Sequence, residues 1–106
     1  MNPLHDLAYF FGGAFLANAA PHMMAALMGR PLQSPFAKPP GEGLSSSTVN
    51  GIWGFANLVV AWLLLAKVGQ FDVRAWDQAG AGLLGILAIT TLLASRFGRF
   101  NGGNLA

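Results

Sequence analysis

The chain has 106 residues, which is enough for one domain and no more. It is 54% hydrophobic and only 9% charged, whereas a typical soluble domain is about 25% charged. The formal net charge of +2 is too small to indicate a nucleic-acid partner, and we predict none. The absence of cysteine excludes disulfides and thiolate metal sites.

Three long stretches of the chain carry no formal charge. Residues 7–29, 43–66 and 78–95 contain no Asp, Glu, Lys or Arg. A helix needs about 20 apolar residues to cross the ~30 Å hydrocarbon core of a bilayer, and a soluble chain this short could not bury three such segments. The sequence therefore predicts an all-α membrane protein, an antiparallel bundle of three transmembrane helices in a single membrane domain over residues 1–106.

The first helix is predicted over about residues 3–28. Asn2 suits the N-cap and Pro3 the first helical position. Pro21 frees a backbone carbonyl within the helix and is expected to kink it. The segment could be mistaken for a signal peptide, but no Lys or Arg precedes it, so we expect it to be retained as a helix.

Residues 29–47 form a Pro/Gly-rich loop between the first and second helices. Its four prolines and its glycines exclude a helix through most of it. One interpretation is a flexible strap outside the membrane. The other is an ordered segment on the lipid headgroups, with Leu32 and Phe36 turned inward, or a segment docked on a partner. The sequence leaves both open.

The second helix is predicted over about residues 48–68 with Ser47 or Thr48 as its cap, and the third over about 77–97 with Asp77 as its cap. Gly98 is expected to end the third helix. Basic residues near helix ends extend their charges into the headgroup region, and tryptophan prefers the same region. The expected interface anchors are Lys67, Trp76, Arg96 and Arg99.

The distribution of Lys and Arg predicts the orientation. Lys67 and Arg74 lie on the side of the N-terminus and the second connection. The opposite side has four basic residues: Arg30, Lys38, Arg96 and Arg99. This excess predicts a multi-pass protein of the bacterial inner (cytoplasmic) membrane, with the N-terminus outside and the C-terminus in the cytoplasm.

Small and polar residues recur at helical spacing and predict the packing faces. Asn18 lies roughly 15 Å from the end of its helix, and Asn57 lies roughly 13.5 Å from the start of the next, so the two should share a depth. The predicted interhelical polar seam consists of Asn18, His22, Asn50 and Asn57. The predicted small-residue packing face consists of Gly54, Ala61, Ala81, Gly85 and Ala88.

His22 is the one ionisable member of the seam. It is a candidate ligand for a haem, a chlorophyll or a quinone, although interhelical hydrogen bonding alone explains the pattern. No catalytic motif or metal-ligand spacing is present, so we predict no enzyme activity, no metal site and no cofactor. The aromatic residues Tyr9, Phe10, Phe11 and Phe15 are expected to face lipid or the membrane interface.

One resemblance adds to this interpretation. It rests on Pro21-His22, on Gly29-Arg30-Pro31 with the segment 34–41, and on residues 50–54 with Asn57-Leu58. These residues resemble small integral membrane proteins of an uncharacterised bacterial family. The resemblance covers roughly the first two helices and implies a defined conformation for the Pro-rich loop, but no activity.

The expected function is that of a non-catalytic accessory or structural subunit. The chain has more small-residue faces than one three-helix bundle uses internally, which favours other membrane protein subunits, or further copies of the chain, as partners. Two alternatives remain. The chain could be a small oligomeric transporter or channel lined by the seam, or a pigment-, haem- or quinone-binding protein that uses His22.

Overall fold

The computed structural model describes residues 1–105, of which helices form the greater part. The helices are α1 (Pro3–Leu27), α2 (Ser47–Trp62) with a π-helical continuation (Leu63–Lys67), and α3 (Trp76–Asn101). Two short strands, β1 (Leu32–Gln33) and β2 (Leu44–Ser45), pair antiparallel between α1 and α2. The predicted all-α class is confirmed.

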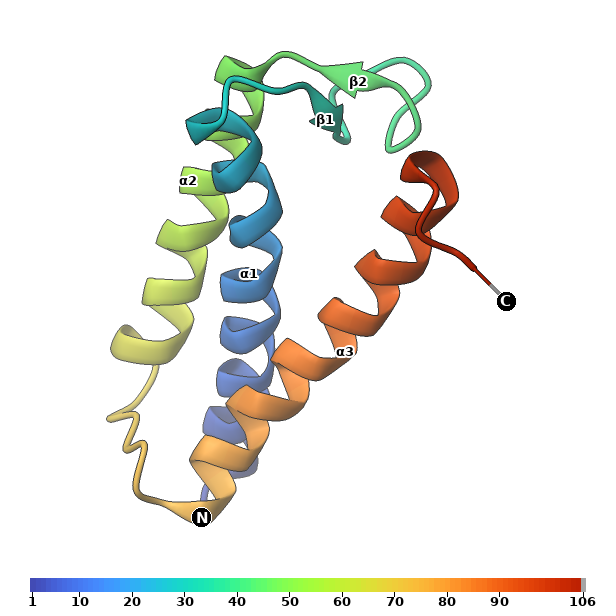
Figure 1. Cartoon of the computed structure of the whole chain (residues 1–106). Coiled ribbons are helices and arrows are strands. Elements are labelled where there is room, and N and C mark those ends of the chain that lie inside the picture. The colour runs from blue at the N-terminus through green and yellow to red at the C-terminus, as the bar shows by residue number, and fades with distance from the viewer. Residues whose placement is uncertain (106) are drawn as a thin grey trace.

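α1 is the central element of the fold. It packs against both α2 and α3, whereas within residues 1–105 α2 and α3 form no substantial interface with each other. Figure 1 shows that α3 crosses α1 near the N-terminal end and then leans away from it. The predicted mutual packing of three helices is therefore wrong for the α2–α3 pair. Beyond Gly85, the larger side chains of Leu93 and Phe97 line a cavity that α1 also borders.

The helix ends differ from the predictions in detail. α1 begins at Pro3 because the Asn2 side chain accepts hydrogen bonds from the backbone N–H groups of Leu4 and His5. The cap of α2 is Ser46, which accepts from the N–H of Val49, and not Ser47 or Thr48 as predicted.

The predicted cap and end of α3 are also wrong. Its N-cap is Ala75, which makes no side-chain capping bond, and Asp77 lies inside the first turn. The helix continues past Gly98 to Asn101 and ends at Gly102, whose φ of 79° is left-handed. Gly98 lies buried inside the helix, where a Cβ would overlap the Asn104 side chain.

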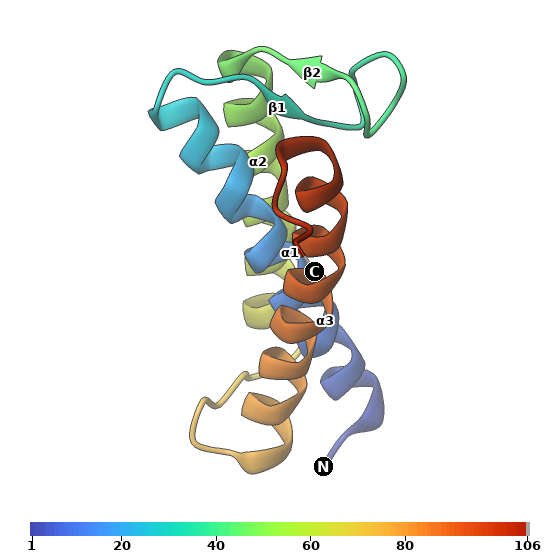
Figure 2. The same ribbon diagram turned by 45° about the vertical axis from the view of Figure 1, so that its right-hand side comes forward.

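The Pro/Gly-rich loop is ordered as a hairpin. Leu32 pairs with Ser45, and the hydroxyls of Ser34 and Ser45 lie 2.6 Å apart in the interior. Figure 2 shows the two strands lying across one end of the helices. Asn101 of α3 donates to the Gln33 side chain at 3.0 Å, so the hairpin also meets α3. The prediction missed these strands because each has only two residues.

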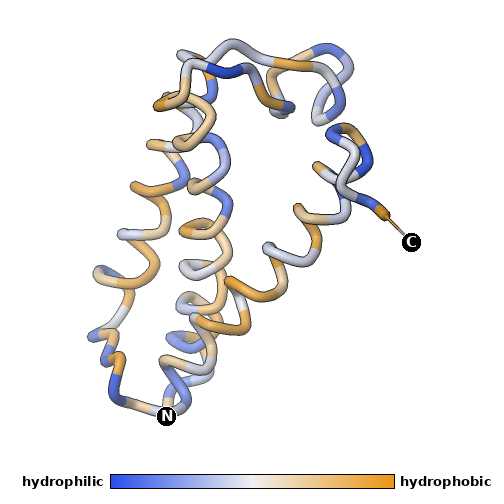
Figure 3. Tube along the Cα trace, viewed as in Figure 1, coloured by the Kyte–Doolittle hydropathy of each residue, from blue (hydrophilic) through white to orange (hydrophobic). Residues whose placement is uncertain are grey.

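Two helices are long and apolar enough to cross a membrane: Ser47–Lys67 and Trp76–Asn101, with mean hydropathies of 1.7 and 1.6 over their most apolar windows. Figure 3 shows apolar residues along both. Only 22% and 11% of those windows is buried inside the protein, unlike the core helix of a soluble domain. α1 does not meet the same criterion, since glycines, a proline, Asn18 and His22 lower its hydropathy.

Candidate functional site

The deeper half of the seam joins α1 to α2 through two asparagines. The amide nitrogen of Asn57 donates to the backbone oxygen of Trp53 at 2.8 Å, which leaves its Oδ1 as an acceptor. Asn18 Nδ2 donates to Asn57 Oδ1, also at 2.8 Å. The Oδ1 of Asn18 is consequently turned away from Asn57, and Asn57 itself is only 1% exposed.

The other half of the seam is centred on Asn50. Its Nδ2 lies 3.2, 3.1 and 3.0 Å from the backbone oxygens of Leu32, Ser45 and Ser46. Carbonyl oxygens only accept hydrogen bonds, so the amide nitrogen must face them and Oδ1 must face α1. His22 Nδ1 lies 2.6 Å from that Oδ1 and must be the donor. In the neutral imidazole, Nε2 is then the acceptor.

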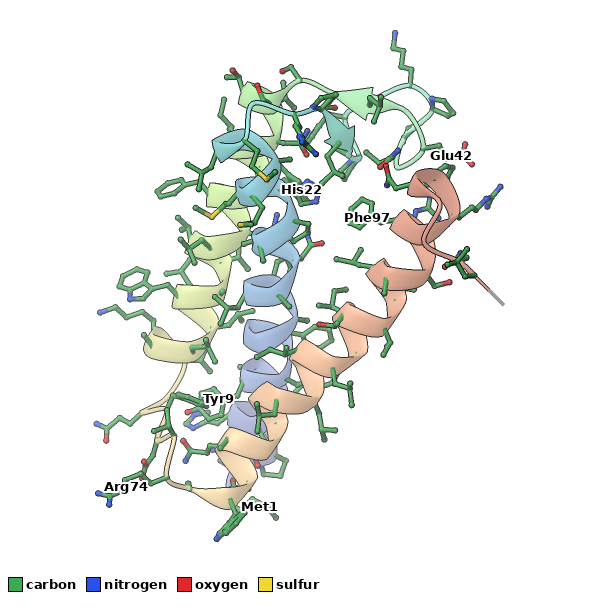
Figure 4. All side chains as sticks on the ribbon, in the orientation of Figure 1. Met1, Tyr9, His22, Glu42, Arg74 and Phe97 are labelled. Carbon is green, nitrogen blue, oxygen red and sulfur yellow. The ribbon has the colours of Figure 1, made fainter. Side chains whose placement is uncertain are left out.

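The His22 ring lies in an aromatic pocket. Its centroid is 6.0 Å from that of Phe97 and 6.4 Å from that of Trp53, both in edge-to-face contact. In Figure 4, Phe97 projects from α3 at the level of His22. The side chain is 3% exposed, and Nε2 has no hydrogen-bond partner in the described part of the chain. Burial and a fixed tautomer make His22 an oriented acceptor.

Two hollows lie between α1 and α3, and His22 lines the first of them. The first, the head cavity, has a volume of about 130 Å³. It is lined by Asn18, His22, Gln33, Ser34, Pro35, Gly41, Trp53, Leu93, Arg96 and Phe97. The second, the apolar groove, has a volume of about 340 Å³. It is lined by Phe10, Phe11, Ala14, Phe15, Asn18, Ala88, Ile89 and Leu92.

The head cavity does not fit a haem or a chlorophyll. Pockets for drug-sized ligands usually measure about 300–1,000 Å³, and the space beside His22 is about 130 Å³. Phe97 and Trp53 also pack edge-to-face with the imidazole and take up space beside it. A macrocyclic pigment on His22 is therefore excluded in this conformation.

The small-residue face is only partly used for packing. Gly54 and Ala61 are buried, and a Cβ on Gly54 would lie 2.6 Å from the Cγ of Met23. On α3, Gly85 is buried against the backbone of Phe10. Ala81 is half-buried, whereas Ala88 is exposed because α3 has already left α1 at that level. Ala88 therefore packs against no helix of the described chain, and its place on a packing face stays a prediction.

The close approach of α1 and α3 depends on a pair of glycines that are not in the predicted small-residue packing face. Gly13 and Gly82 are both buried, and a Cβ on Gly13 would overlap the backbone carbonyl of Gly82. In the sequence, the Gly12-Gly13 pair indicates a close approach of another helix, but it does not indicate which helix approaches.

The expected interface anchors are all exposed. Lys67 lies over the Trp62 ring, with Nζ 5.2 Å from the centroid, and Trp76 is 94% exposed at the start of α3. Arg96 and Arg99 both approach the ring of Phe100. Arg96 also lines the head cavity, a position that the sequence did not indicate.

A carboxyl pair at the opposite end of the molecule was also missed. Asp6 and Asp77 precede two of the uncharged stretches and face each other across α1 and α3. Burial first, and then Asp77, raises the pKa of Asp6 above its ordinary value. Tyr9 lies near both carboxyls, and its ring packs edge-on against Phe71 with the centroids 4.9 Å apart. Figure 4 labels Tyr9 near the N-terminal end of α1. It is 1% exposed, so the lipid-facing position expected for it is wrong.

Comparison of the chain with models of protein families, with curated proteins and with solved structures gives no match. The resemblance to small bacterial membrane proteins stays a prediction. The function of the chain is therefore inferred from its geometry.

Proposed function

We propose that the chain is an integral membrane protein of a bacterial cytoplasmic membrane and a non-catalytic, structural subunit of a larger membrane assembly. In this proposal all three helices cross the bilayer, the N-terminus is outside, and the hairpin and C-terminus are cytoplasmic. Asn18, His22, Asn50 and Asn57 hold α1 and α2 together within it.

The observation that carries the membrane location is the exposed apolar surface of α2 and α3. Ile52 and Phe55 on α2 are 68% and 60% exposed. Leu83, Leu84 and Leu87 on α3 are 65%, 59% and 58% exposed. Soluble monomers rarely expose contiguous apolar surface larger than a few hundred Å², whereas lipid chains solvate such surface without cost.

The polar seam supports a packing role over a permeation role. Asn50 and Asn57 are 0% and 1% exposed, and both amide nitrogens are hydrogen-bonded to carbonyls. A water-filled path would need such groups on its wall. A channel would therefore have to form between copies of the chain, since the Asn50 and Asn57 amides inside one copy are already hydrogen-bonded.

A partner subunit is suggested by the one-sided packing of α3. This helix contacts α1 near its N-terminal half, and its remaining face, including Leu84 and Leu87, is uncovered. Within the described residues, α2 does not cover that face. A neighbouring transmembrane helix would do so by van der Waals packing.

Two experiments test the proposal in order. After cell lysis and high-speed sedimentation without detergent, the protein should be in the membrane pellet; recovery in the supernatant ends the membrane assignment. Purification in a mild detergent, followed by native mass spectrometry, should then yield a stoichiometric larger complex.

A pair of matched variants locates the contact. Leu84→Asn should release the partner, whereas Phe55→Asn, an equally exposed position on α2, should retain it. Isolation of the wild-type chain solely as a monomer would overturn the subunit role while leaving the membrane location intact.

A further inference from the structure

We propose that the cleft between α1 and α3 binds one anionic membrane phospholipid whose headgroup carries free hydroxyls, of the phosphatidylglycerol type. The head cavity takes the polar group and the apolar groove takes one acyl chain. The inference rests on the proposed membrane location and adds a specific ligand to it.

The first argument is a pair of unused acceptors. The carbonyls around Asn50 force His22 to donate through Nδ1, so Nε2 presents a lone pair. The carbonyl of Trp53 forces Asn57 to accept from Asn18, so Asn18 Oδ1 is also free to accept. His22 and Asn18 lie one helical turn apart, and both line the head cavity. Two adjacent acceptors fit a ligand with two hydroxyl donors.

The second argument is the charge at the rim. Arg96 lines the cavity and is exposed, and it donates to the oxygen of Gly41 over a long distance of 3.4 Å. Among residues 1–105, none that lines the cavity bears a carboxylate. Arg96 is the first charged residue after the uncharged stretch 78–95, which places it at the depth of lipid phosphates. Its guanidinium fits a phosphate.

The third argument is the continuity of the two hollows. Asn18 lines both of them, and Leu92 and Leu93 lie next to each other on α3 with one facing each hollow. The groove is apolar apart from Asn18, and its lining comes from α1 and α3. Figure 1 shows that α3 leans away from α1 beyond their crossing. A hydrocarbon chain in the groove therefore places its head beside His22 and Arg96.

These groups together select one class of lipid. A phosphate accepts from Arg96 and headgroup hydroxyls donate to His22 and Asn18. A choline headgroup has no hydroxyl to donate and no net negative charge. Phosphatidic acid has the anion without the headgroup hydroxyls, and a quinol has hydroxyls without the anion. In a membrane, burial of an acyl chain gives little preference for one lipid over another, so the headgroup determines which lipid binds.

Native mass spectrometry of the protein released from nanodiscs tests the proposal. The nanodiscs contain phosphatidylcholine, phosphatidylglycerol and phosphatidic acid in equal amounts. We expect one phosphatidylglycerol per chain to be retained, enriched over the other two. Arg96→Gln should weaken retention about tenfold, the size expected for a hydrogen bond to a charged group. Arg99→Gln is the matched control, because Arg99 is exposed on the same helix but does not line the cavity.

The groove is tested separately. Leu92→Trp fills it and should displace the lipid, whereas Leu87→Trp, at a similarly exposed position outside the groove, should not. His22→Phe keeps a ring and removes the acceptor, and should abolish the preference for phosphatidylglycerol over phosphatidic acid. If that variant fails to fold by circular dichroism, the Arg96 and Leu92 series decides on its own.

Several outcomes would overturn the inference without touching the membrane location. They are equal retention of all three lipids, an Arg99→Gln effect as large as that of Arg96→Gln, and a retained quinol from native membranes. Complete displacement of the lipid by free glycerol 3-phosphate would show that the groove plays no part. Recovery of the protein in the soluble fraction would end the proposed function itself.

Discussion

His22 of α1 donates through Nδ1 to Asn50 of α2 at 2.6 Å, while the amide nitrogen of the same asparagine lies against the hairpin backbone. Asn50 is fully buried and thus joins α1, α2 and the β1–β2 hairpin in one contact. The Asn50 amide therefore fixes the hairpin to α2, together with the bond from Asn101 of α3 to Gln33.

The first prediction concerns this amide. Asn50→Leu keeps the branched shape of the side chain but removes its hydrogen bonds to His22 Nδ1 and to the hairpin carbonyls. Each buried polar group left unpaired costs about 1–3 kcal/mol, so the unfolding midpoint in detergent should fall strongly. Asn104→Ala is the control, since the Asn104 amide donates at an exposed site. Equal stability of the two variants would contradict the central role of Asn50.

The second prediction concerns the deeper pair. Asn18→Ala, Asn57→Ala and the double variant form a cycle that isolates the contact between the two side chains. Interhelical hydrogen bonds in membrane proteins average about 0.6 kcal/mol and reach about 1.7 kcal/mol. We expect a coupling free energy in this range, measured by unfolding in mixed micelles. Strict additivity would show that the 2.8 Å contact contributes nothing.

The third prediction tests the crossing of α1 and α3. A Cβ at Gly85 would overlap the backbone oxygen of Phe10, which cannot move aside without moving α1. Gly85→Ala should destabilise the protein by about 1–3 kcal/mol. Gly80→Ala, with open space around it, should be neutral or stabilising by roughly 0.5–1 kcal/mol. Indistinguishable unfolding curves would mean that the helices do not approach so closely.

The fourth prediction is a pH dependence at the Asp6–Asp77 pair. Burial and Asp77 raise the pKa of Asp6, while the N-terminal amine of Met1 and His5 oppose the shift. Tyr9 is a neutral neighbour at neutral pH and adds no charge. The folded state therefore holds the Asp6 proton more tightly than the unfolded state, where the pKa is near 3.8. This stabilisation is full below that value and is lost as pH rises through the raised pKa.

The unfolding midpoint should accordingly fall as pH rises from about 3.8. Asp77→Asn removes the neighbouring charge and should weaken the dependence, and Asp72→Asn, in the exposed connection, should leave it unchanged. A midpoint that rises over this window in the wild type would contradict the shift.

The fifth prediction concerns topology. The chain has no cysteine, so single cysteines report position without interference. Val73→Cys, in the exposed connection before α3, should react with a membrane-impermeant maleimide in intact cells. Pro40→Cys, in the hairpin, should react only after permeabilisation. The reverse pattern would show that the modest excess of basic residues does not set the orientation.

Much of the helical structure followed from local chemistry. Asn2-Pro3 marked the start of α1, and the uncharged stretches marked the bodies of the helices, because capping and hydropathy are short-range properties. The end of α3 was misplaced at Gly98, because a glycine ends a helix only where its backbone leaves the helical region. Gly98 stays helical, and Gly102 is the glycine with a left-handed φ.

The site was less accessible to sequence reasoning. Helix rise alone suggested that Asn18 and Asn57 share a depth, since α1 and α2 are neighbours in the chain. The hydrogen-bond donor and acceptor roles of His22 could not be derived, because they depend on three carbonyls contributed by the hairpin and by α2. Arg96 and Phe97 reach the same cavity from a helix more than 70 residues along the chain.

The amino-acid order by itself determined that the chain forms long apolar helices with a few amides and one imidazole among them, since hydropathy and helical period are read along a single segment. Which helix lies in the middle, where α3 parts from α1, and which nitrogen of His22 stays unpaired were decided only by the tertiary structure. Those features depend on the close backbone approach that Gly13, Gly82 and Gly85 allow and on carbonyls from distant segments. Such contacts have no signature in the local sequence.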